Sequence, residues 1–318
     1  MIGSRELKKI LFCGLESGGK TSILLLLDKK FSLLPTVKPT IKAKRTFHTN
    51  SLLGTSIVRW DLGGQKNYRK IYLGDKSKYF TEMQSIFYVI DVQAPEKFEE
   101  SLTFLKDIIN ITSDSHLDNF QFLILLHKYD PDIKNNKDVL NHINYLENEI
   151  SSVIKDVKFS IFRTSIYDEP SLLKAFSDGV FYATHKSKMF ESLLKEYMGK
   201  TYNSSMLLLD QNCFIIASRT TNENYQKICE AIAPRLTQAL EKLEEWDINT
   251  IDIVTNIEFP EKQSKFQKEG IIFLRKLDIG DTRLYLVALC LNKKVKIKSY
   301  EYLPLLATNL KNLLESFE

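Results

Sequence analysis

An eight-residue stretch, Gly14–Thr21, reads G-L-E-S-G-G-K-T and fits the pattern G-x-x-x-x-G-K-[ST] at every fixed position. It follows a short apolar run, Lys9–Cys13, and precedes a helical pattern that starts at Thr21. Glycines allow the main chain to curl so tightly that successive N–H groups point inward and form an anion-binding nest. The N-terminus of the following helix adds its dipole. This strand–loop–helix unit predicts a phosphate-binding loop and restricts the chain to folds that can carry one.

The side chains of this loop have distinct expected roles. Lys20 is placed to reach the β- and γ-phosphates of a nucleotide, and the Thr21 hydroxyl is placed to ligate Mg²⁺. We therefore expect Lys20 to act in catalysis as well as in binding, and Thr21 to be a metal ligand. The residues expected to bind the phosphates are Gly14, Glu16, Ser17, Gly18, Gly19, Lys20, Thr21 and Ser22.

A second motif, W-D-L-G-G-Q at Trp60–Gln65, ends the next strand-like run. Asp61 is placed to hold the shell of the magnesium ion, and Gly64 can offer a main-chain N–H to a γ-phosphate. Gln65 is placed to orient the attacking water, which makes it the other expected catalytic residue. Between the two motifs, Thr40 can close on Mg²⁺ and the γ-phosphate when a triphosphate is bound. Thr36 is an alternative in the same loop.

A third group of residues is expected to recognise the base. His127-Lys128-Tyr129-Asp130 follows the apolar run Phe120–Leu126. A carboxylate at Asp130 can accept hydrogen bonds from guanine N1–H and from the exocyclic amine, a pattern that adenine lacks. The stem of Lys128 can cover the face of the base, and the His127 imidazole can bond to neighbouring main chain. After a further apolar run come Ser165 and Ile166, whose amides are expected near guanine O6.

Apolar runs and helical patterns alternate in the first half of the chain, which predicts βαβ units, a mostly parallel sheet and a doubly wound α/β fold. Near-continuous apolar runs are typical of strands that are covered on both faces. The expected strands are Lys9–Cys13, Thr55–Trp60, Ser85–Val92, Phe120–Leu126 and Val157–Phe162, and the expected intervening helices include Glu96–Ile109 and Asp138–Ile154.

The pattern changes after about residue 200. A hairpin signal at Ser205–Ser218 is followed by apolar residues at helical spacing from Tyr225 to Leu243. Three strand-like runs and a last amphipathic helix complete the order β-β-α-β-β-β-α, which predicts a smaller α+β domain with helices on one side of an antiparallel sheet. The amphipathic stretch Met189–Met198 lacks Gly and Pro, so we expect a helix at the boundary.

Composition limits the class of protein. The net charge of +4 is too small to indicate a nucleic-acid partner by itself. The lysine-rich run Lys293–Lys298 is interpreted as a solvated edge strand, with contact to anionic lipid or nucleic acid as the alternative. Four cysteines far apart in the sequence indicate buried reduced thiols. We expect no signal peptide, no membrane span and no myristoylation, hence a cytoplasmic protein whose attachment to a membrane, if any, comes through a partner or an unmarked surface.

Taken together, these stretches resemble the Ras-like small GTPases, and among them the Rag (Gtr) branch. The Rag-like features are His-Lys-x-Asp at 127–130, F-R-T-S-I-Y-D-E at 162–169, Leu53-Gly54, Y-V-I-D-V at 88–92 and the spacing from Tyr68 to Gln84. The phosphate loop and W-D-L-G-G-Q also resemble Arf proteins. The resemblance covers the whole chain. It implies a small GTPase domain at 1–186 and a roadblock/longin-like dimerisation domain at 187–318, through which two Rag subunits pair.

The leading hypothesis is a regulatory small GTPase. Such a protein binds GTP or GDP with Mg²⁺, hydrolyses GTP slowly and switches its binding to regulatory and effector proteins. The resemblance implies a homo- or heterodimer. The alternative is a scaffold or assembly subunit that holds nucleotide with little or no turnover, against which Gln65 argues. A P-loop ATPase or nucleotide kinase is a weaker alternative, because Asp130 favours guanine and no second Arg-rich lid is present.

Overall fold

The computed structural model describes residues 6–48, 55–113, 120–154, 157–181, 185–259, 269–279, 282–291 and 296–315. Leu53 and Gly54, which belong to the resemblance, lie outside these ranges. The chain forms two compact units, and the division falls between Val180 and Phe181. The boundary at residues 186 and 187 remains a prediction.

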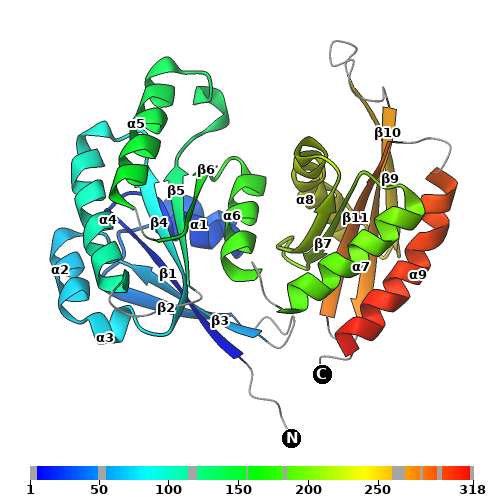
Figure 1. Ribbon diagram of the computed structural model, residues 1–318, viewed down its shortest axis with the longest axis horizontal. Helices are drawn as coiled ribbons and strands as arrows, with labels where there is room; N and C mark the ends of the chain where they lie inside the picture. Colours follow the sequence, from blue (N-terminus) through cyan, green and yellow to red (C-terminus); the bar gives the residue numbers. More distant parts are fainter. Residues whose placement is uncertain are drawn as a thin grey trace, which may run out of the picture. The chain divides into compact units, whose positions relative to one another are not determined.

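The first unit contains a six-stranded sheet in the order β2-β3-β1-β4-β5-β6 (Figure 1). All neighbouring strands are parallel except β2, which runs antiparallel to β3. This arrangement confirms the predicted doubly wound, mostly parallel fold, although β2 was not predicted. The strands are β1 (Glu6–Gly14), β2 (Ala43–His48), β3 (Thr55–Leu62), β4 (Met83–Asp91), β5 (Gln121–His127) and β6 (Phe159–Thr164).

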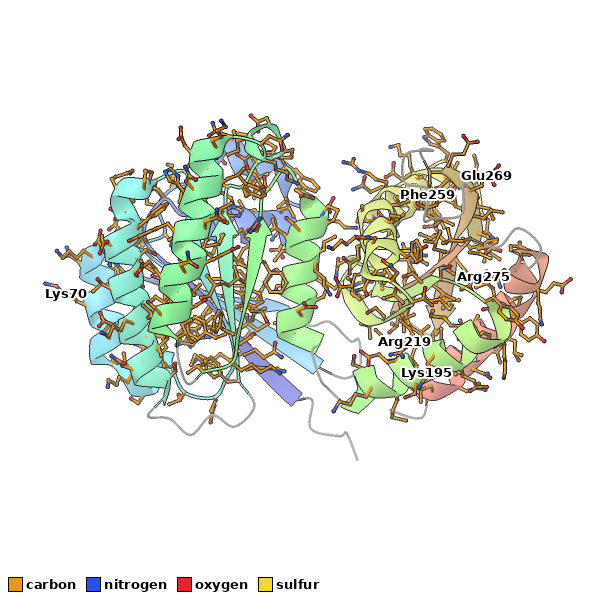
Figure 2. All side chains as sticks on the ribbon, turned by 45° about the horizontal axis from the view of Figure 1, so that its top comes forward. Lys70, Lys195, Arg219, Phe259, Glu269 and Arg275 are labelled. Carbon is orange, nitrogen blue, oxygen red and sulfur yellow. The ribbon has the colours of Figure 1, made fainter. Side chains whose placement is uncertain are left out.

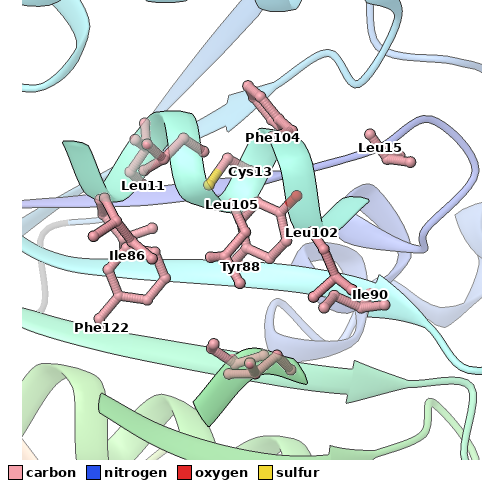
Figure 3. Close-up of a cluster of buried hydrophobic side chains, with 14 of the residues drawn as sticks. Leu11, Cys13, Leu15, Ile86, Tyr88, Ile90, Leu102, Phe104, Leu105 and Phe122 are labelled. Atoms are coloured by element: carbon pink, nitrogen blue, oxygen red, sulfur yellow. The ribbon is translucent and has the colours of Figure 1, made fainter. Parts of the chain in front are cut away.

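Helices cover both faces of this sheet (Figure 1). Figure 3 shows one face, where Leu11, Ile86 and Tyr88 pack against Leu105 of the helix that follows β4. On the other face Phe12 stacks on Phe87, with 4.7 Å between the ring centroids. The helices are α1 (Lys20–Leu27), η1 (Phe31–Thr36), α2 (Lys66–Gly74), α3 (Lys76–Tyr79), η3 (Pro95–Lys97), α4 (Phe98–Ser113), η4 (Pro131–Ile133), α5 (Lys137–Val153) and α6 (Glu169–Phe181).

The second unit contains a five-stranded antiparallel sheet in the order β8-β7-β11-β10-β9. Its elements are α7 (His185–Thr201), β7 (Ser205–Asp210), β8 (Ile215–Thr220), α8 (Glu223–Glu245), β9 (Asp252–Glu258), β10 (Glu269–Ile279), β11 (Thr282–Cys290) and α9 (Lys296–Glu315). The predicted order β-β-α-β-β-β-α is therefore confirmed, and α7, which precedes it, contains the helix expected at Met189–Met198. This α+β unit fits a roadblock-like domain.

Two expectations about the second unit are wrong. Helices cover both faces of its sheet, with α8 on one face and α7 and α9 on the other (Figure 1). The physical reason is visible in β7, where every residue is buried, so each face needs a covering layer. The second error concerns the lysine-rich run. Lys293–Val295 lie outside the described residues, but residues 296–298 begin α9 and form no edge strand.

The surface of both units carries exposed charged side chains, of which Figure 2 labels Lys70, Lys195 and Arg219. The four cysteines are all buried. Among the residues that the structure describes, no helix is long and apolar enough to cross a bilayer.

Candidate functional site

The loop between β1 and α1 has the backbone geometry of a phosphate-binding nest. Gly14 and Gly19 have φ of +133° and +93°, and Ser17 between them has φ of +61°. These values lie in the region that glycine adopts most readily. A Cβ atom on Gly14 would lie 2.3 Å from the main-chain oxygen of Val89 in β4. The loop therefore needs glycine at both ends, and Gly19 leads directly into α1.

Lys20 is buried inside this loop, with only 5% of its surface exposed. Its Nζ donates to the carbonyl oxygens of Gly14 at 3.1 Å and Leu15 at 2.7 Å. Burial lowers the pKa of this ammonium, and the nearby Asp61 opposes that effect. The loop thus holds a buried cation, which an anion bound by the main-chain N–H groups would contact.

Three oxygen-bearing side chains converge beside the loop. Thr21 Oγ1 donates to Asp61 Oδ2 at 2.7 Å, and Thr40 Oγ1 donates to the same oxygen at 3.0 Å. The two hydroxyl oxygens are 2.8 Å apart. Asp61 is 3% exposed, and its Oδ1 is buried without a hydrogen-bond partner among the described residues. By contrast, Thr36 Oγ1 donates to Leu33 O, so the structure brings Thr40 to this cluster.

The segment after Asp61 packs between the loop that carries Thr40 and the phosphate loop. The Gly63 N–H donates to Lys42 O at 2.9 Å, and a Cβ on Gly63 would lie 2.5 Å from Thr40 O. A Cβ on Gly64 would lie 2.2 Å from the Glu16 nitrogen. Gln65 follows as the N-terminal capping residue of α2, with its side chain half-buried. The two glycines therefore allow this segment to lie against the phosphate loop.

His127 joins the phosphate loop to the end of β6. Its Nδ1 shares a hydrogen bond of 3.0 Å with Thr164 Oγ1. The ring packs on Gly19, because a Cβ there would lie 2.6 Å from His127 Cδ2. Burial, with a smaller contribution from Lys128, lowers the pKa of His127 to about 4. The ring is therefore neutral near pH 7 and acts as a packed hydrogen-bonding group.

The predicted base-recognition residues form a hydrogen-bonded cluster around Asp130. Its carboxylate accepts from Ser165 Oγ at 2.5 Å and from Gln93 Nε2 at 3.2 Å. Gln93 also donates to Lys128 O at 2.7 Å, and Lys128 Nζ pairs with Asp91 Oδ2 at 2.5 Å. Sequence reasoning missed the roles of Asp91 and Gln93, which end β4 and begin the turn after it.

The amides expected near a base lie beside this cluster. The Ser165 N–H donates to Ser171 Oγ at 3.3 Å, and the Ser165 hydroxyl also accepts from the Tyr167 N–H at 3.0 Å. Ile166 follows, half-buried. Hydrogen bonds within the loop after β6 thus fix its conformation without a ligand.

A cavity of about 450 Å³ opens along the phosphate loop. The residues that line it are Glu16, Ser17, Gly18, Gly19, Lys20, Thr21, Ser22, Val37, Lys38, Pro39, Thr40, Gly64, Gln65, Lys97 and Lys128. Four of these are lysines and one is an acid, which favours a polyanionic ligand. Sequence reasoning predicted most of this lining but missed Val37, Lys38, Pro39 and Lys97. The predicted site residues that do not line the cavity are Gly14, Asp61, His127, Asp130, Ser165 and Ile166.

Comparison with known proteins agrees with this geometry. The conserved region of the Gtr1/RagA G proteins matches residues 9–236, which is more than half of the chain. The chain belongs to the Gtr1/RagA G protein family. As a member of it, the protein is a small GTPase that binds GTP and GDP and hydrolyses GTP, which confirms the predicted enzyme class.

Individual relatives of this family are distant. Ras-related GTP-binding protein A of Dictyostelium discoideum is 24% identical over 223 residues, covering 70% of this chain and 72% of the relative. GTP-binding protein GTR1 of Saccharomyces cerevisiae is 26% identical over 227 residues, with coverage of 70% and 72%. ADP-ribosylation factor-like protein 3 of the same yeast is 28% identical over 148 residues, covering 44% of this chain and 70% of the relative. The similarity to both groups confirms the predicted Rag-like and Arf-like features of this Gtr1/RagA-family GTPase.

Proposed function

We propose that this Gtr1/RagA-family GTPase is a nucleotide-state switch that binds GTP or GDP with Mg²⁺, hydrolyses GTP slowly and changes its protein partners with the bound nucleotide. The observation that carries the proposal is the meeting of Thr21, Thr40 and Asp61. These residues belong to three different segments. A ligand that engages all three must order the loop around Thr40 and the segment from Asp61 to Gln65 together.

The residues fit a magnesium ion. Mg²⁺ prefers hard oxygen ligands, and the cluster offers two hydroxyls and a carboxylate. The orphaned Asp61 Oδ1 is a buried acceptor for which a metal-bound water is a natural donor. We assign Thr21 and Thr40 as direct ligands and Asp61 to the shell around the ion. When bound, Mg²⁺ would neutralise the negative charge that develops on the phosphate oxygens.

We assign the remaining predicted residues by their position relative to the cavity, some lining it and others next to Lys128 outside the lining. The loop amides and Lys20 hold the β- and γ-phosphates, and the Gly64 N–H meets the γ-phosphate. At the other end Asp130, already oriented by Ser165 and Gln93, accepts two hydrogen bonds from guanine. Lys128, held by Asp91, covers the base, and the amides of Ser165 and Ile166 face guanine O6. His127 supports both ends through Gly19 and Thr164.

Gln65 is the proposed orienting group for the attacking water. Intrinsic hydrolysis without an activating protein should be slow, on the order of 10⁻⁴ to 10⁻² per second. We predict that Gln65→Leu slows single-turnover GTP hydrolysis at least about tenfold, or about 1.4 kcal/mol of the barrier, with GTP affinity retained. Asn67→Leu, an exposed position on the same helix, serves as the matched control. Equal rates in wild type and Gln65→Leu would favour the nucleotide-holding scaffold instead.

We further propose that the second unit pairs with another subunit through β9. This strand lies at the edge of its sheet, and β10 is its one neighbour among the strands that the structure describes. The outer edge of such a strand can offer main-chain donors and acceptors to a strand of another chain. Ile251 and Val254 are 55% and 51% exposed on or beside the strand. Arg275 of β10, labelled in Figure 2, pairs with Asp252 and fixes the start of β9.

The pairing can be tested on the full-length chain. We expect wild type to sediment at twice the 36.9 kDa of one chain. In a symmetric dimer each substitution occurs twice, so Val254→Lys should weaken association at least about tenfold. Leu305→Lys, an equally exposed apolar position on α9, is the matched control. A wild-type chain that stays monomeric at every concentration would contradict self-pairing and leave a different subunit as the partner.

The proposed setting is cytoplasmic. Regulatory and effector proteins would bind the segments that carry Thr40 and Gln65, because these are the segments that the nucleotide orders. Any recruitment to a membrane surface would go through such a partner. The small net charge offers no support for a nucleic-acid partner.

A further inference from the structure

Lys97 lies in the cavity without belonging to any nucleotide-binding motif of the sequence. It ends η3, the single turn between β4 and α4, and is half-buried. It lines the same cavity as Lys20, Thr40 and Gln65. The Lys97 N–H bonds back to Ala94 O at 3.0 Å, which fixes the main chain of the turn.

The ammonium group of Lys97 makes no hydrogen bond or ion pair with the residues that the structure describes. Two acidic neighbours are engaged elsewhere, because Glu100 pairs with Arg69 and Glu99 accepts from the Tyr145 hydroxyl. Of the other lysines that line the cavity, Lys38 is exposed, and Lys20 and Lys128 differ from Lys97 in being partnered. Lys20 is satisfied by two carbonyls, and Lys128 is paired with Asp91. Lys97 is thus a half-buried cation whose charge is available to a ligand.

The topology explains why this turn reaches the cavity. Strands β1 and β4 are neighbours and pair Gly14 with Val89 at the phosphate loop. The chain leaves β1 toward α1 and leaves β4 toward α4, which cover opposite faces of the sheet (Figure 1). Where consecutive connections diverge in this way, a crevice opens at the carboxyl ends of the strands, and ligands bind there. The phosphate loop and Lys97 both line the cavity at this edge of the sheet.

We propose that Lys97 is a phosphate-binding residue that contacts the polyphosphate of the bound guanine nucleotide and favours the triphosphate over the diphosphate. The proposal rests on the proposed function, since the cavity must hold a nucleotide. A lysine is a compact point charge on a flexible stem and can follow a phosphate without fixed geometry. Its attraction grows with the charge of the ligand and is stronger in a cavity than in bulk water. A triphosphate therefore gains more from Lys97 than a diphosphate does.

The test compares dissociation constants of a non-hydrolysable GTP analogue and of GDP, both with Mg²⁺, for the full-length chain. For Lys97→Ala we expect the triphosphate analogue to bind about tenfold more weakly, roughly a loss of 1.4 kcal/mol, and GDP to be affected less. Lys97→Arg, which keeps the charge, should remain near wild type. Lys106→Ala removes the same charge from an exposed position on α4 and should leave both constants unchanged.

The outcomes separate this proposal from the one before it. If wild type binds guanine nucleotide but Lys97→Ala matches Lys106→Ala, or if the ratio of the two constants does not change, Lys97 does not contact the phosphates. If wild type binds no guanine nucleotide, the proposed function fails and this proposal fails with it. Thermal unfolding of each variant without nucleotide shows that the comparison is made between folded proteins.

Discussion

Lys20→Ala is expected to release the nucleotide almost completely. The ammonium is buried and fixed by two loop carbonyls, so it is already in position when a phosphate enters. Removing one partner of a buried charge pair costs roughly 3–5 kcal/mol, which corresponds to about a 10²- to 10⁴-fold weaker complex. The nucleotide content of the purified protein and a titration with GDP would both measure this loss.

The controls for this variant follow from the structure. Lys106→Ala should keep its nucleotide, because that side chain is exposed on α4 and does not line the cavity. The Lys20→Ala substitution also leaves the carbonyls of Gly14 and Leu15 without their donor, so the stability of the variant must be compared with nucleotide-free wild type. A folded Lys20→Ala protein that holds GDP as tightly as the parent would refute the assignment of the phosphate loop.

Asp130→Asn is expected to reverse the choice of base. A carboxylate accepts from both N1–H and the exocyclic amine of guanine, and hydrogen bonds to a charged group contribute about 1.5–3 kcal/mol each. Xanthine carries a carbonyl in place of that amine. The amide of asparagine can donate to this carbonyl and still accept from N1–H. GDP should therefore bind about 10²- to 10⁴-fold more weakly, and xanthosine diphosphate should bind more tightly than GDP.

A filter-binding competition measures this reversal. Asp132→Asn makes the same chemical change two residues along the chain, at an exposed side chain of η4, and should leave the preference for guanine intact. In wild type, ATP should compete poorly with GTP. Equal competition by ATP, or an Asp130→Asn protein that still prefers GDP, would remove Asp130 from base recognition.

Sequence patterns predicted the strands with continuous apolar runs best. Strands β4 and β5 are buried on both faces, and their continuous apolar runs are therefore easily recognised as strands. Strand β2 was missed because A-K-R-T-F-H mixes polar and apolar residues, and it pairs with β3 at the edge of the described sheet. The pairing of β2 with β3 joins residues that are distant in sequence, and no local pattern of residues in β2 predicts it. The helix at Met189–Met198 was expected, but its role as a layer of the second sheet depends on packing.

In the site, too, local sequence patterns predicted some residues, while others depend on how distant segments pack. Residues in contiguous motifs were predicted because a local spacing determines their chemistry, as for Lys20 and Asp130. Gln93 and Lys97 come from the connection after β4, which has no recognisable motif. Their place in the site depends on the adjacency of β1 and β4. A signal did exist, since any residue just after β4 must lie at the carboxyl edge of the sheet.

The contact between Gly19 and His127 couples two positions that are far apart in the sequence. The imidazole fills the volume that a side chain at position 19 would need, and it reaches Thr164 at the same time. A larger residue at position 19 cannot be tolerated while His127 is present, even apart from the cost of its positive φ. A side chain at position 19 would therefore displace the imidazole and break its bond to Thr164, so that a change near the phosphates would also disturb the support of the base.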